Sequence, residues 1–328
     1  MVSHRFPPWL VKRLPNPSQA HSLKALLRKN RLVTVCEEAR CPNLFECFSR
    51  GTATFMIGGD ICTRTCGYCA VKKGNPGPLD PKEPSHVGEA AAQLGLHHVV
   101  VTMVNRDDLP DGAAMHVVAT IEAIRDRLPE ATVEVLVSDF MGNFAAVEKV
   151  VRAKPNVFNH NIETVRRLFK KTRPKGNYER SLRIIGTARE IDPDMTTKSG
   201  AMVGLGETEE DVLNLIDDLR QPNVDCQILT IGQYLSPQNK AIPVHEYIHP
   251  DTFESYRVAG LKSGFAYVYA GPFVRSSYNA HEALLAAHES KIYPTGDPES
   301  WSFMTEDMSG KKYSDRPESH SGLPVKAG

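Results

Sequence analysis

Six of the seven cysteines in this chain fall into two groups of three. The first cysteine group is Cys36, Cys41 and Cys47, and the second cysteine group is Cys62, Cys66 and Cys69. Three thiolates can hold one metal centre and leave a coordination position for a ligand other than cysteine. An open position lets a metal act chemically on a bound molecule, whereas a closed four-thiolate site holds the fold or transfers electrons. Both groups are therefore candidates for metal chemistry, while Cys226, isolated in an apolar run, is predicted to be structural.

The second cysteine group has C-x3-C-x2-C spacing and directly follows an apolar run at 54–57. Three thiolates on one short loop suit one face of a cubane four-iron, four-sulfur cluster and leave its fourth iron without a protein ligand. The alternative is a zinc knuckle that lacks one ligand, but zinc sites favour C-x2-C pairs and four ligands. The first cysteine group has C-x4-C-x5-C spacing, which fits zinc and an iron–sulfur cluster about equally well.

From about residue 52, short β-branched runs alternate with amphipathic helical stretches. The predicted strands are 54–57, 98–102, 132–137, 156–158, 197–203 and 226–231, followed by a short strand at 266–270. An apolar stripe between two of them contains Val117, Ile121 and Ile124. Repeated βα units imply a parallel sheet with functional loops at the carboxyl ends of its strands. Periodicity alone allows either a partial barrel of six units or an open doubly wound sheet.

Composition narrows the classes of function. Acidic and basic residues balance at 39 each in 328 residues, so no global positive field attracts nucleic acid or an anionic membrane. No run approaches the ~18 apolar residues of a membrane helix, and prolines interrupt the N-terminal stretch where a signal peptide has its apolar core. We therefore expect a cytoplasmic protein with no nucleic-acid or membrane partner. In that compartment, clustered cysteines indicate metal or redox chemistry rather than disulfides.

The C-x3-C-x2-C motif, at this place in a βα series, resembles the radical S-adenosylmethionine superfamily. The resemblance implies that the iron without a protein ligand binds S-adenosylmethionine, whose reductive cleavage gives methionine and a 5′-deoxyadenosyl radical. Tyr68, inside the motif, matches an aromatic position near the adenine. Gly200-x-Met202-x-Gly204-x-x-Glu207 resembles a G-x-I-x-G-x-x-E pattern found beside the adenine, where glycines allow a ligand to approach the backbone closely.

Further polar residues follow the predicted strands and have both functional and structural interpretations. Asn105 opens a charged loop after the second strand, where a barrel presents functional residues. Glu163 could accept hydrogen bonds from ribose hydroxyls or interact with a helix macrodipole. Arg173 and Lys198 could bind a carboxylate or be ordinary surface charges. Arg275 could orient a neighbouring ligand, shield a cluster or pair with an acid.

The first cysteine group, together with RSSY at 275–278, resembles the lipoyl synthase family. The resemblance runs from about residue 30 to 285 and includes FMIGGDICTR, VNRDDLPDG, NHNIETV, TKSGAMVGLGET, LTIGQYLSP and GPFVRSSY. It implies that the first cysteine group holds an auxiliary four-iron, four-sulfur cluster whose fourth ligand is Ser277. It also implies an α/β fold with a partial (β/α)6 TIM-like barrel at 51–235, between an N-terminal cysteine-rich extension at 1–50 and a C-terminal segment at 236–288. Residues 289–328 lack an apolar period and are expected to be disordered.

The activity implied by this resemblance is a sulfurtransferase reaction. Two sulfur atoms from the auxiliary cluster enter carbons 6 and 8 of an octanoyl group on a lysine of a lipoyl carrier domain, the final step of endogenous protein lipoylation, and two S-adenosylmethionine molecules are consumed. The expected carriers are dehydrogenase E2 subunits and the glycine cleavage H protein. The other expected partners are reduced flavodoxin or ferredoxin as electron donor and an iron–sulfur carrier protein.

Two alternative functions remain at this point. Another radical S-adenosylmethionine sulfur-inserting enzyme could act on a free small molecule, as biotin synthase does, but it would not need the first cysteine group and RSSY together. An iron–sulfur electron carrier belongs to a different class. Its C-x2-C-x2-C-x3-C-P spacing is absent, and it needs neither open irons nor six βα units.

Overall fold

The computed structural model describes residues 6–11, 24–25, 27–28, 32–49 and 54–292. The described residues include only the first part of the tail expected to be disordered, 289–328. Residues 289–292 complete helix α11 (Ala280–Ile292), so the prediction of disorder is wrong for them, and residues 293–328 lie outside the described residues. None of the described helices is long and apolar enough to cross a membrane.

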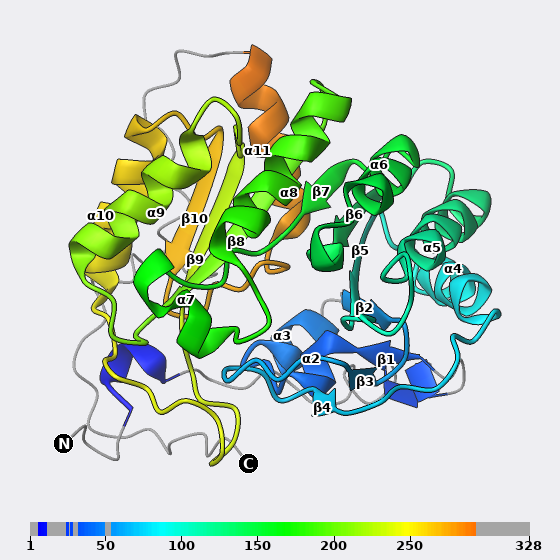
Figure 1. Ribbon diagram of the computed structural model, residues 1–328, viewed down its shortest axis with the longest axis horizontal. Helices are drawn as coiled ribbons and strands as arrows, with labels where there is room; N and C mark the ends of the chain where they lie inside the picture. Colours follow the sequence, from blue (N-terminus) through cyan, green and yellow to red (C-terminus); the bar gives the residue numbers. More distant parts are fainter. Residues whose placement is uncertain (1–5, 12–23, 26, 29–31, 50–53, 293–328) are drawn as a thin grey trace.

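One sheet of eight strands, in the order β1-β2-β5-β6-β7-β8-β9-β10, forms the centre of the fold (Figure 1). Its strands are β1 Val33–Thr34, β2 Thr54–Ile57, β5 His98–Met103, β6 Thr132–Leu136, β7 Val157–Asn159, β8 Thr196–Val203, β9 Ile228–Gln233 and β10 Tyr267–Gly271. Neighbours from β2 to β10 pair in parallel and in chain order, without the order reversal of a doubly wound sheet. Among the described strands no pairing joins β10 to β1 or β2, so the barrel is partial, as the resemblance implied.

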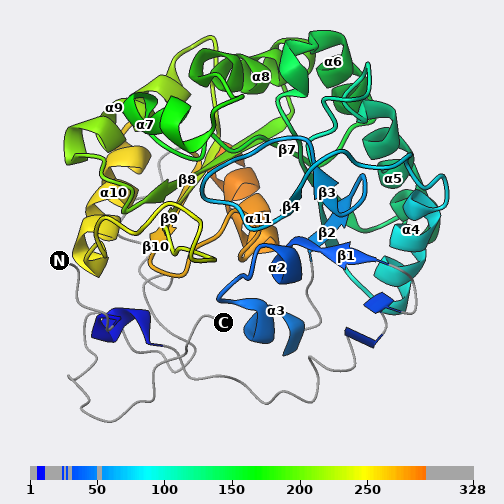
Figure 2. The ribbon, with the colours of Figure 1, turned by 60° about the horizontal axis from the view of Figure 1, so that its bottom comes forward.

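Helices follow the strands in turn and cover the outside of the sheet. They are α4 Glu83–Gln93, α5 Ala114–Arg127, α6 Phe144–Arg152, α7 Arg166–Thr172, α8 Tyr178–Ile191, α9 Glu209–Arg220 and α10 Pro250–Lys262. Figure 2 shows these helices as an arc around the strands, with α11 inside the arc. The predicted strands are all confirmed, with ends that agree to within two residues.

The buried core lies between the strands and the outer helices because each of these helices has an apolar face. The stripe predicted on α5 is confirmed, since Val117, Ile121 and Ile124 are at most 2 % exposed. Helix α9 begins at a capping box, in which the Thr208 hydroxyl accepts a hydrogen bond from Asp211 N and the Asp211 carboxylate accepts one from Thr208 N. Fixed helix starts of this kind define where the strand-to-helix loops end.

The N-terminal extension joins the sheet at its edge. Strand β1 pairs antiparallel with β2 and places Thr34 opposite Phe55. The Thr34 hydroxyl then caps α2 (Val35–Glu38) by accepting a hydrogen bond from Glu37 N at 3.3 Å, and the chain continues into α3 (Leu44–Ser49). The first cysteine group lies on this β1–α2–α3 segment, which is therefore anchored to the barrel.

Four short elements complete the described structure. Strands β3 (Ile61–Cys62) and β4 (Lys72–Lys73) form a separate two-stranded parallel sheet. The 3₁₀ turns η1 (Pro8–Leu10) and η2 (Phe140–Gly142) lie near the N-terminus and after β6. The second cysteine group begins in β3 and occupies the loop that leads to β4.

Candidate functional site

Both cysteine groups line one cavity of about 760 Å³, a volume typical of small-ligand sites. All six grouped cysteines and Ser277 belong to its wall. The wall also contains residues that end or follow strands β5, β6, β7 and β9, among them Asn105, Ser138, Asn161 and Gln233. The cavity therefore lies at the carboxyl ends of the parallel strands, where a barrel of this kind presents its functional loops.

The loop that carries the second cysteine group is tied to distant segments. Gly67 N donates a hydrogen bond to Thr172 O at 2.9 Å, and Ile242 N donates one to Gly67 O at 3.0 Å. A Cβ on Gly67 would lie 2.8 Å from the Ile242 side chain, so a larger residue there would have to displace that side chain. Burial raises the pKa of the Cys66 thiol, and it raises the pKa of the Cys69 thiol to about 12. Because a metal binds the thiolate, loading of this site is coupled to proton release.

The RSSY segment packs against α3, which carries Cys47, and against the residues just before it. Tyr278 Oη donates a hydrogen bond to Glu46 Oε1 at 2.7 Å, across 232 positions of sequence. Asn43 Nδ2 donates one to Phe273 O at 2.6 Å. Burial, with a contribution from the neighbouring cysteine, raises the pKa of the Cys36 thiol to about 12. The fold thus brings the segment that contains the predicted serine ligand to the three cysteines that lack a fourth ligand.

Arg275 of RSSY lies between the sheet and the first cysteine group. Its Nη1 donates a hydrogen bond to Val274 O at 2.6 Å, and Cys41 lies close enough to interact with it electrostatically. A Cβ on Gly232, in β9, would lie 2.1 Å from Val274 O, so the segment packs directly on the strand. Of the interpretations left open for Arg275, this position favours a role beside the auxiliary site.

Three of the five predicted cofactor-binding residues line the same cavity, namely Tyr68, Asn105 and Glu163, and Arg173, predicted in a supporting role, lines it too. Glu163 has a φ of +71°, a left-handed conformation that a non-glycine residue rarely adopts and that costs about 1–3 kcal/mol. Burial raises the pKa of Glu163, while the nearby Arg173 opposes the increase. Backbone strain of this kind is concentrated at functional positions, which supports the prediction made for Glu163.

Several residues that line the cavity carry a polar side-chain atom that is buried without a hydrogen-bond partner in the described structure. These atoms are Arg64 Nη1, Asn105 Oδ1, Asn161 Oδ1 and Arg173 Nε. Unpaired buried donors and acceptors cost about 1–3 kcal/mol each, so their presence at one cavity indicates a polar ligand. S-adenosylmethionine carries a carboxylate, an ammonium group and ribose hydroxyls, and therefore supplies both the acceptors and the donors that these atoms need.

Two of the predicted cofactor-binding residues, Gly204 and Glu207, are not in the cavity wall, although Gly200 and Met202 of the same motif are. Gly204 has a φ of +98°. A Cβ there would lie 2.2 Å from Gln233 Nε2, so glycine allows the end of β8 to pack closely against the end of β9. The Glu207 carboxylate accepts a hydrogen bond from Leu205 N at 2.9 Å and another from Gly204 N, which shapes the loop. Both residues therefore support the cavity from behind it.

Lys198 lies inside the barrel, fully buried. Its Nζ is 3.0 Å from both carboxylate oxygens of Glu134, which is also fully buried. Asn159 Nδ2 donates a further hydrogen bond to Glu134 Oε1 at 2.8 Å. Lys198 therefore binds a carboxylate, but one of the protein itself, and the structure places it outside the cavity wall rather than at the surface or beside a ligand.

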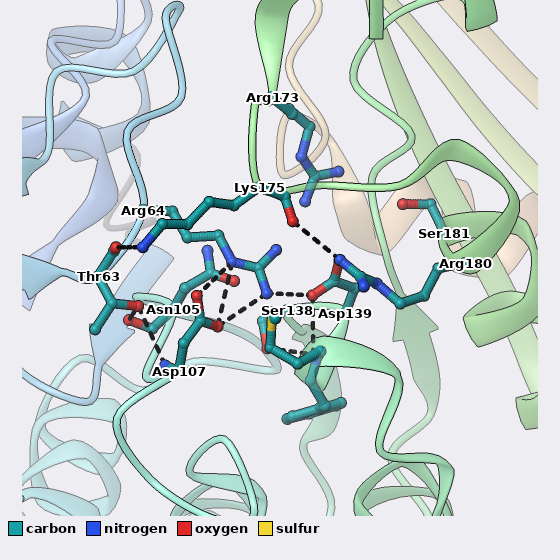
Figure 3. A network of polar contacts seen from close by, with 12 residues as sticks. Thr63, Arg64, Asn105, Asp107, Ser138, Asp139, Arg173, Lys175, Arg180 and Ser181 are labelled. Atoms are coloured by element: carbon teal, nitrogen blue, oxygen red, sulfur yellow. Dashed lines mark hydrogen bonds and ion pairs between the residues drawn. The ribbon is translucent and has the colours of Figure 1, made fainter. Parts of the chain in front are cut away.

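Sequence reasoning missed Arg64, which lies between Cys62 and Cys66. Its side chain is 1 % exposed and forms ion pairs with Asp107 and Asp139 (Figure 3). The available signal was an arginine inside the cysteine motif and an aspartate in each of the loops after the second and third strands, Asp107 and Asp139. The distance between those segments in the sequence concealed their contact.

Comparisons with known protein families agree with this geometry. A model described as the radical SAM superfamily matches residues 56–219, and one described as the N-terminal domain of lipoyl synthase matches residues 2–41. A lipoyl synthase of Caldanaerobacter subterraneus subsp. tengcongensis is 54% identical over 86% of this chain and 98% of that protein. A lipoyl synthase of Thermus thermophilus is 50% identical over 87% of this chain and 88% of that protein.

Solved structures share the fold at low sequence identity. HydG, a maturase of the [FeFe]-hydrogenase, has a TM-score of 0.52 and 15% identity over 83% of this chain and 67% of that chain. Streptococcus suis SuiB bound to its precursor peptide SuiA has a TM-score of 0.52 and 13% identity over 80% of this chain and 56% of that chain. These similarities concern the arrangement of strands and helices alone.

Proposed function

The chain belongs to the lipoyl synthase family of the radical S-adenosylmethionine superfamily, and we propose that it inserts two sulfur atoms at carbons 6 and 8 of a protein-bound octanoyl group. The observation that carries this proposal is the single cavity lined by both cysteine groups and by the RSSY segment. Such a cavity allows one substrate chain to lie between a site that removes hydrogen and a site that supplies sulfur.

We assign the two sites to different cysteine groups. The second cysteine group would hold the cluster that binds S-adenosylmethionine, and the first cysteine group with Ser277 would hold the auxiliary cluster. When bound, these cofactors supply the radical that removes hydrogen from an unactivated carbon and the sulfur that replaces it. The protein's part is to position these groups and the substrate and to keep the cavity dry.

Polar residues of the wall would orient the cofactor. The Arg173 guanidinium, whose Nη1 already donates to Asn161 O at 3.0 Å, has an unpaired Nε with which to hold an anionic group. The Oδ1 atoms of Asn105 and Asn161 can accept hydrogen bonds from ammonium or hydroxyl groups. Tyr68 and Glu163 lie beside them in the cavity wall.

Apolar residues between the two cysteine groups would receive the octanoyl chain. Met56, Val71 and Val104 form a buried cluster against which Val35 of α2 and Cys62 pack. All five line the cavity, and the cluster therefore provides a continuous apolar surface from one metal site to the other. Burial of an alkyl chain on such a surface is favourable by about 0.8 kcal/mol per methylene group.

The finer assignments concern partners. We propose octanoylated lipoyl carrier domains of dehydrogenase E2 subunits and the glycine cleavage H protein as substrates, and reduced flavodoxin or ferredoxin as electron donor. An iron–sulfur carrier protein would rebuild the auxiliary cluster after its sulfur is consumed. Family membership supports these partners and a cytoplasmic location.

The test is an anaerobic reconstitution followed by reaction with dithionite, S-adenosylmethionine and an octanoyl-lysyl peptide. We expect about eight irons per chain, formation of 5′-deoxyadenosine and a peptide that carries two added sulfur atoms. Deoxyadenosine without peptide thiolation would favour a small-molecule substrate, as in the biotin synthase alternative. Zinc in place of iron would contradict the proposal.

A further inference from the structure

Arg64 is buried in the loop of the second cysteine group although its neighbour Thr65 is exposed. An arginine is rarely fully buried unless it is paired. Here Nε lies 2.8 Å from Asp107 Oδ2 and Nη2 lies 2.9 Å from Asp107 Oδ1, which is the bidentate arrangement that fixes orientation as well as charge. The same Nη2 lies 2.5 Å from Asp139 Oδ1. The loop is thus joined to residues that follow two strands, β5 and β6.

Asp139 is itself held from a third element. Its carboxylate is fully buried, and Arg180 of α8 donates from Nε to Asp139 Oδ2 at 2.8 Å. The two residues after Asp139 have positive φ values, +43° for Phe140 and +54° for Met141, and Met141 N donates to Asp139 Oδ1 at 3.2 Å. Two consecutive strained residues are retained here only because surrounding contacts compensate for the strain. The position of this carboxylate is therefore strongly determined.

Backbone contacts join the same two loops beside the arginine. Thr63 N and Thr63 Oγ1 both donate to Asn105 O, at 3.1 and 2.9 Å, and Asp107 N donates to Thr63 Oγ1 at 3.1 Å. Lys175 Nζ donates to Thr63 O at 3.1 Å, while Arg180 Nη2 donates to Lys175 O at 3.0 Å. Figure 3 shows that these contacts form a closed network around Arg64. The links from Asn105, Asp107, Asp139 and Lys175 end on Thr63 or Arg64, between the first two cysteines of the motif, and Arg180 supports them from behind.

We propose that Arg64 is a positioning residue, which fixes the loop of the second cysteine group to Asp107 and Asp139 so that its sulfurs keep the arrangement that cluster binding requires. This inference rests on the proposed function of that group. Within the network, two positive side chains, Arg64 and Arg180, are ion-paired with two negative ones, Asp107 and Asp139, so the buried charge of Arg64 is compensated. Replacement of residues that contact metal ligands or their loop, without binding the metal themselves, typically lowers metal affinity or activity by about 10–100-fold.

The first test compares variants that break the network with one that breaks a similar network elsewhere. Asp225 also pairs with two arginines, Arg189 and Arg220, each at 2.7 Å, and lies outside the cavity wall. The full chain is reconstituted as wild type, Arg64→Lys, Asp139→Asn and Asp225→Asn. We expect the Arg64 and Asp139 variants to lose iron to a chelator about tenfold faster than wild type, and Asp225→Asn to match wild type.

The change that S-adenosylmethionine causes in the electron paramagnetic resonance spectrum of the reduced enzyme is recorded on the same samples. It should be weakened in Arg64→Lys and Asp139→Asn and normal in Asp225→Asn. Thermal unfolding of the cluster-free chains is measured in parallel. If the Arg64 variant is merely less stable, with normal iron retention and a normal spectral change, Arg64 only stabilises the fold and the proposal is overturned.

A double-mutant cycle separates positioning from direct contact, because the unpaired Nη1 of Arg64 lies in the cavity wall. If Arg64 acts through the carboxylates, Arg64→Gln combined with Asp107→Asn should have no larger effect than the stronger single change. Asp107 is 17 % exposed, so its replacement perturbs folding less than that of Asp139. Additive effects, with normal S-adenosylmethionine binding in the aspartate variants, would overturn the proposal. A wild-type chain that takes up no iron would instead overturn the proposed function.

Discussion

The RSSY segment contains two adjacent serines, Ser276 and Ser277, of which only Ser277 is the predicted iron ligand. Ser276 Oγ accepts a hydrogen bond from Asn161 Nδ2 at 3.3 Å, which fixes it to the loop after β7. Both serines line the cavity with the first cysteine group, and the family resemblance assigns the iron-ligand role to Ser277. A hydroxyl oxygen is a weaker match for iron than a thiolate, so a serine ligand suits a cluster that must be taken apart.

Replacement of Ser277 by alanine should therefore lower the yield of thiolated peptide by about tenfold or more and make part of the bound iron labile. The matched control is Ser276→Ala, which removes one hydrogen bond worth about 1 kcal/mol and should leave the iron content near eight. Mass spectrometry of the peptide and iron analysis of the protein measure the two effects. Equal losses in both variants would indicate that the segment matters only for folding.

The two cysteine groups should separate into two activities. Alanine in place of Cys36, Cys41 and Cys47 should abolish thiolation of the peptide and leave cleavage of S-adenosylmethionine intact. Alanine in place of Cys62, Cys66 and Cys69 should abolish both. Cys226→Ala is the control, because that thiol is fully buried outside the cavity wall. Loss of cleavage in the first variant, at normal iron occupancy of the second group, would contradict this division.

The Lys198–Glu134 pair provides a test of a residue that the sequence placed near a ligand. Removing one member of a fully buried pair leaves an uncompensated charge and costs about 3–5 kcal/mol. Lys198→Met should therefore destabilise the chain by this amount in urea titrations, and Glu134→Gln should restore much of the loss when combined with it. Affinity for S-adenosylmethionine, measured by equilibrium binding, should not change. A tenfold weaker affinity would show that Lys198 reaches the cofactor.

At the scale of elements, the sequence could predict features that depend on interactions between nearby residues, but not those that depend on contacts between distant segments. Strands and helices followed from local periodicity, and the capping box at Thr208 lies within four residues of chain. The contact between Tyr278 and Glu46, by contrast, spans 232 positions, and no local pattern encodes it. The same reason concealed the ion pair from Arg64 to Asp139, which spans 75 positions. The cysteines of the site could be predicted, whereas the residues that position them could not.

Two glycines after β8, Gly204 and Gly206, provide a test of how much stability depends on close packing at the end of that strand. Both have left-handed backbones, with φ of +98° at Gly204 and +107° at Gly206, so alanine is strained at either position. A Cβ on Gly204 would lie 2.2 Å from Gln233 Nε2 and 2.5 Å from Glu246 O, whereas one on Gly206 would meet nothing closer than 3.5 Å. Gly204→Ala should therefore cost about 1–3 kcal/mol more than Gly206→Ala in urea unfolding. Equal costs would mean that backbone strain alone accounts for the glycine.

At the scale of the whole molecule, the inside of the barrel is closed by a helix from the far end of the chain. His281 of α11 stacks on His98 of β5, with ring centroids 5.5 Å apart, and Figure 2 shows α11 within the arc of helices. His98 Nδ1 also lies 2.7 Å from Thr132 Oγ1 in β6. Burial, with Lys198 and His281 nearby, lowers the pKa of His98 from 6.5 to about 3; the opposing carboxylate of Glu134, 3.9 Å from Nε2, is already neutralised by Lys198. The folded chain therefore holds this ring neutral.

This neutral ring predicts a pH dependence of stability. Below pH 6.5 and above about 3, the unfolded chain carries a proton on His98 that the folded chain does not. Stability contributed by the neutral ring is thus present above pH 6.5 and is lost as the pH falls, at up to about 1.4 kcal/mol per pH unit. Urea unfolding of the cluster-free chain should show a slope smaller by this amount for His98→Gln than for wild type. His97→Gln, at the exposed neighbouring position, should keep the wild-type slope, and an unchanged slope in His98→Gln would mean that the folded barrel admits a charged ring.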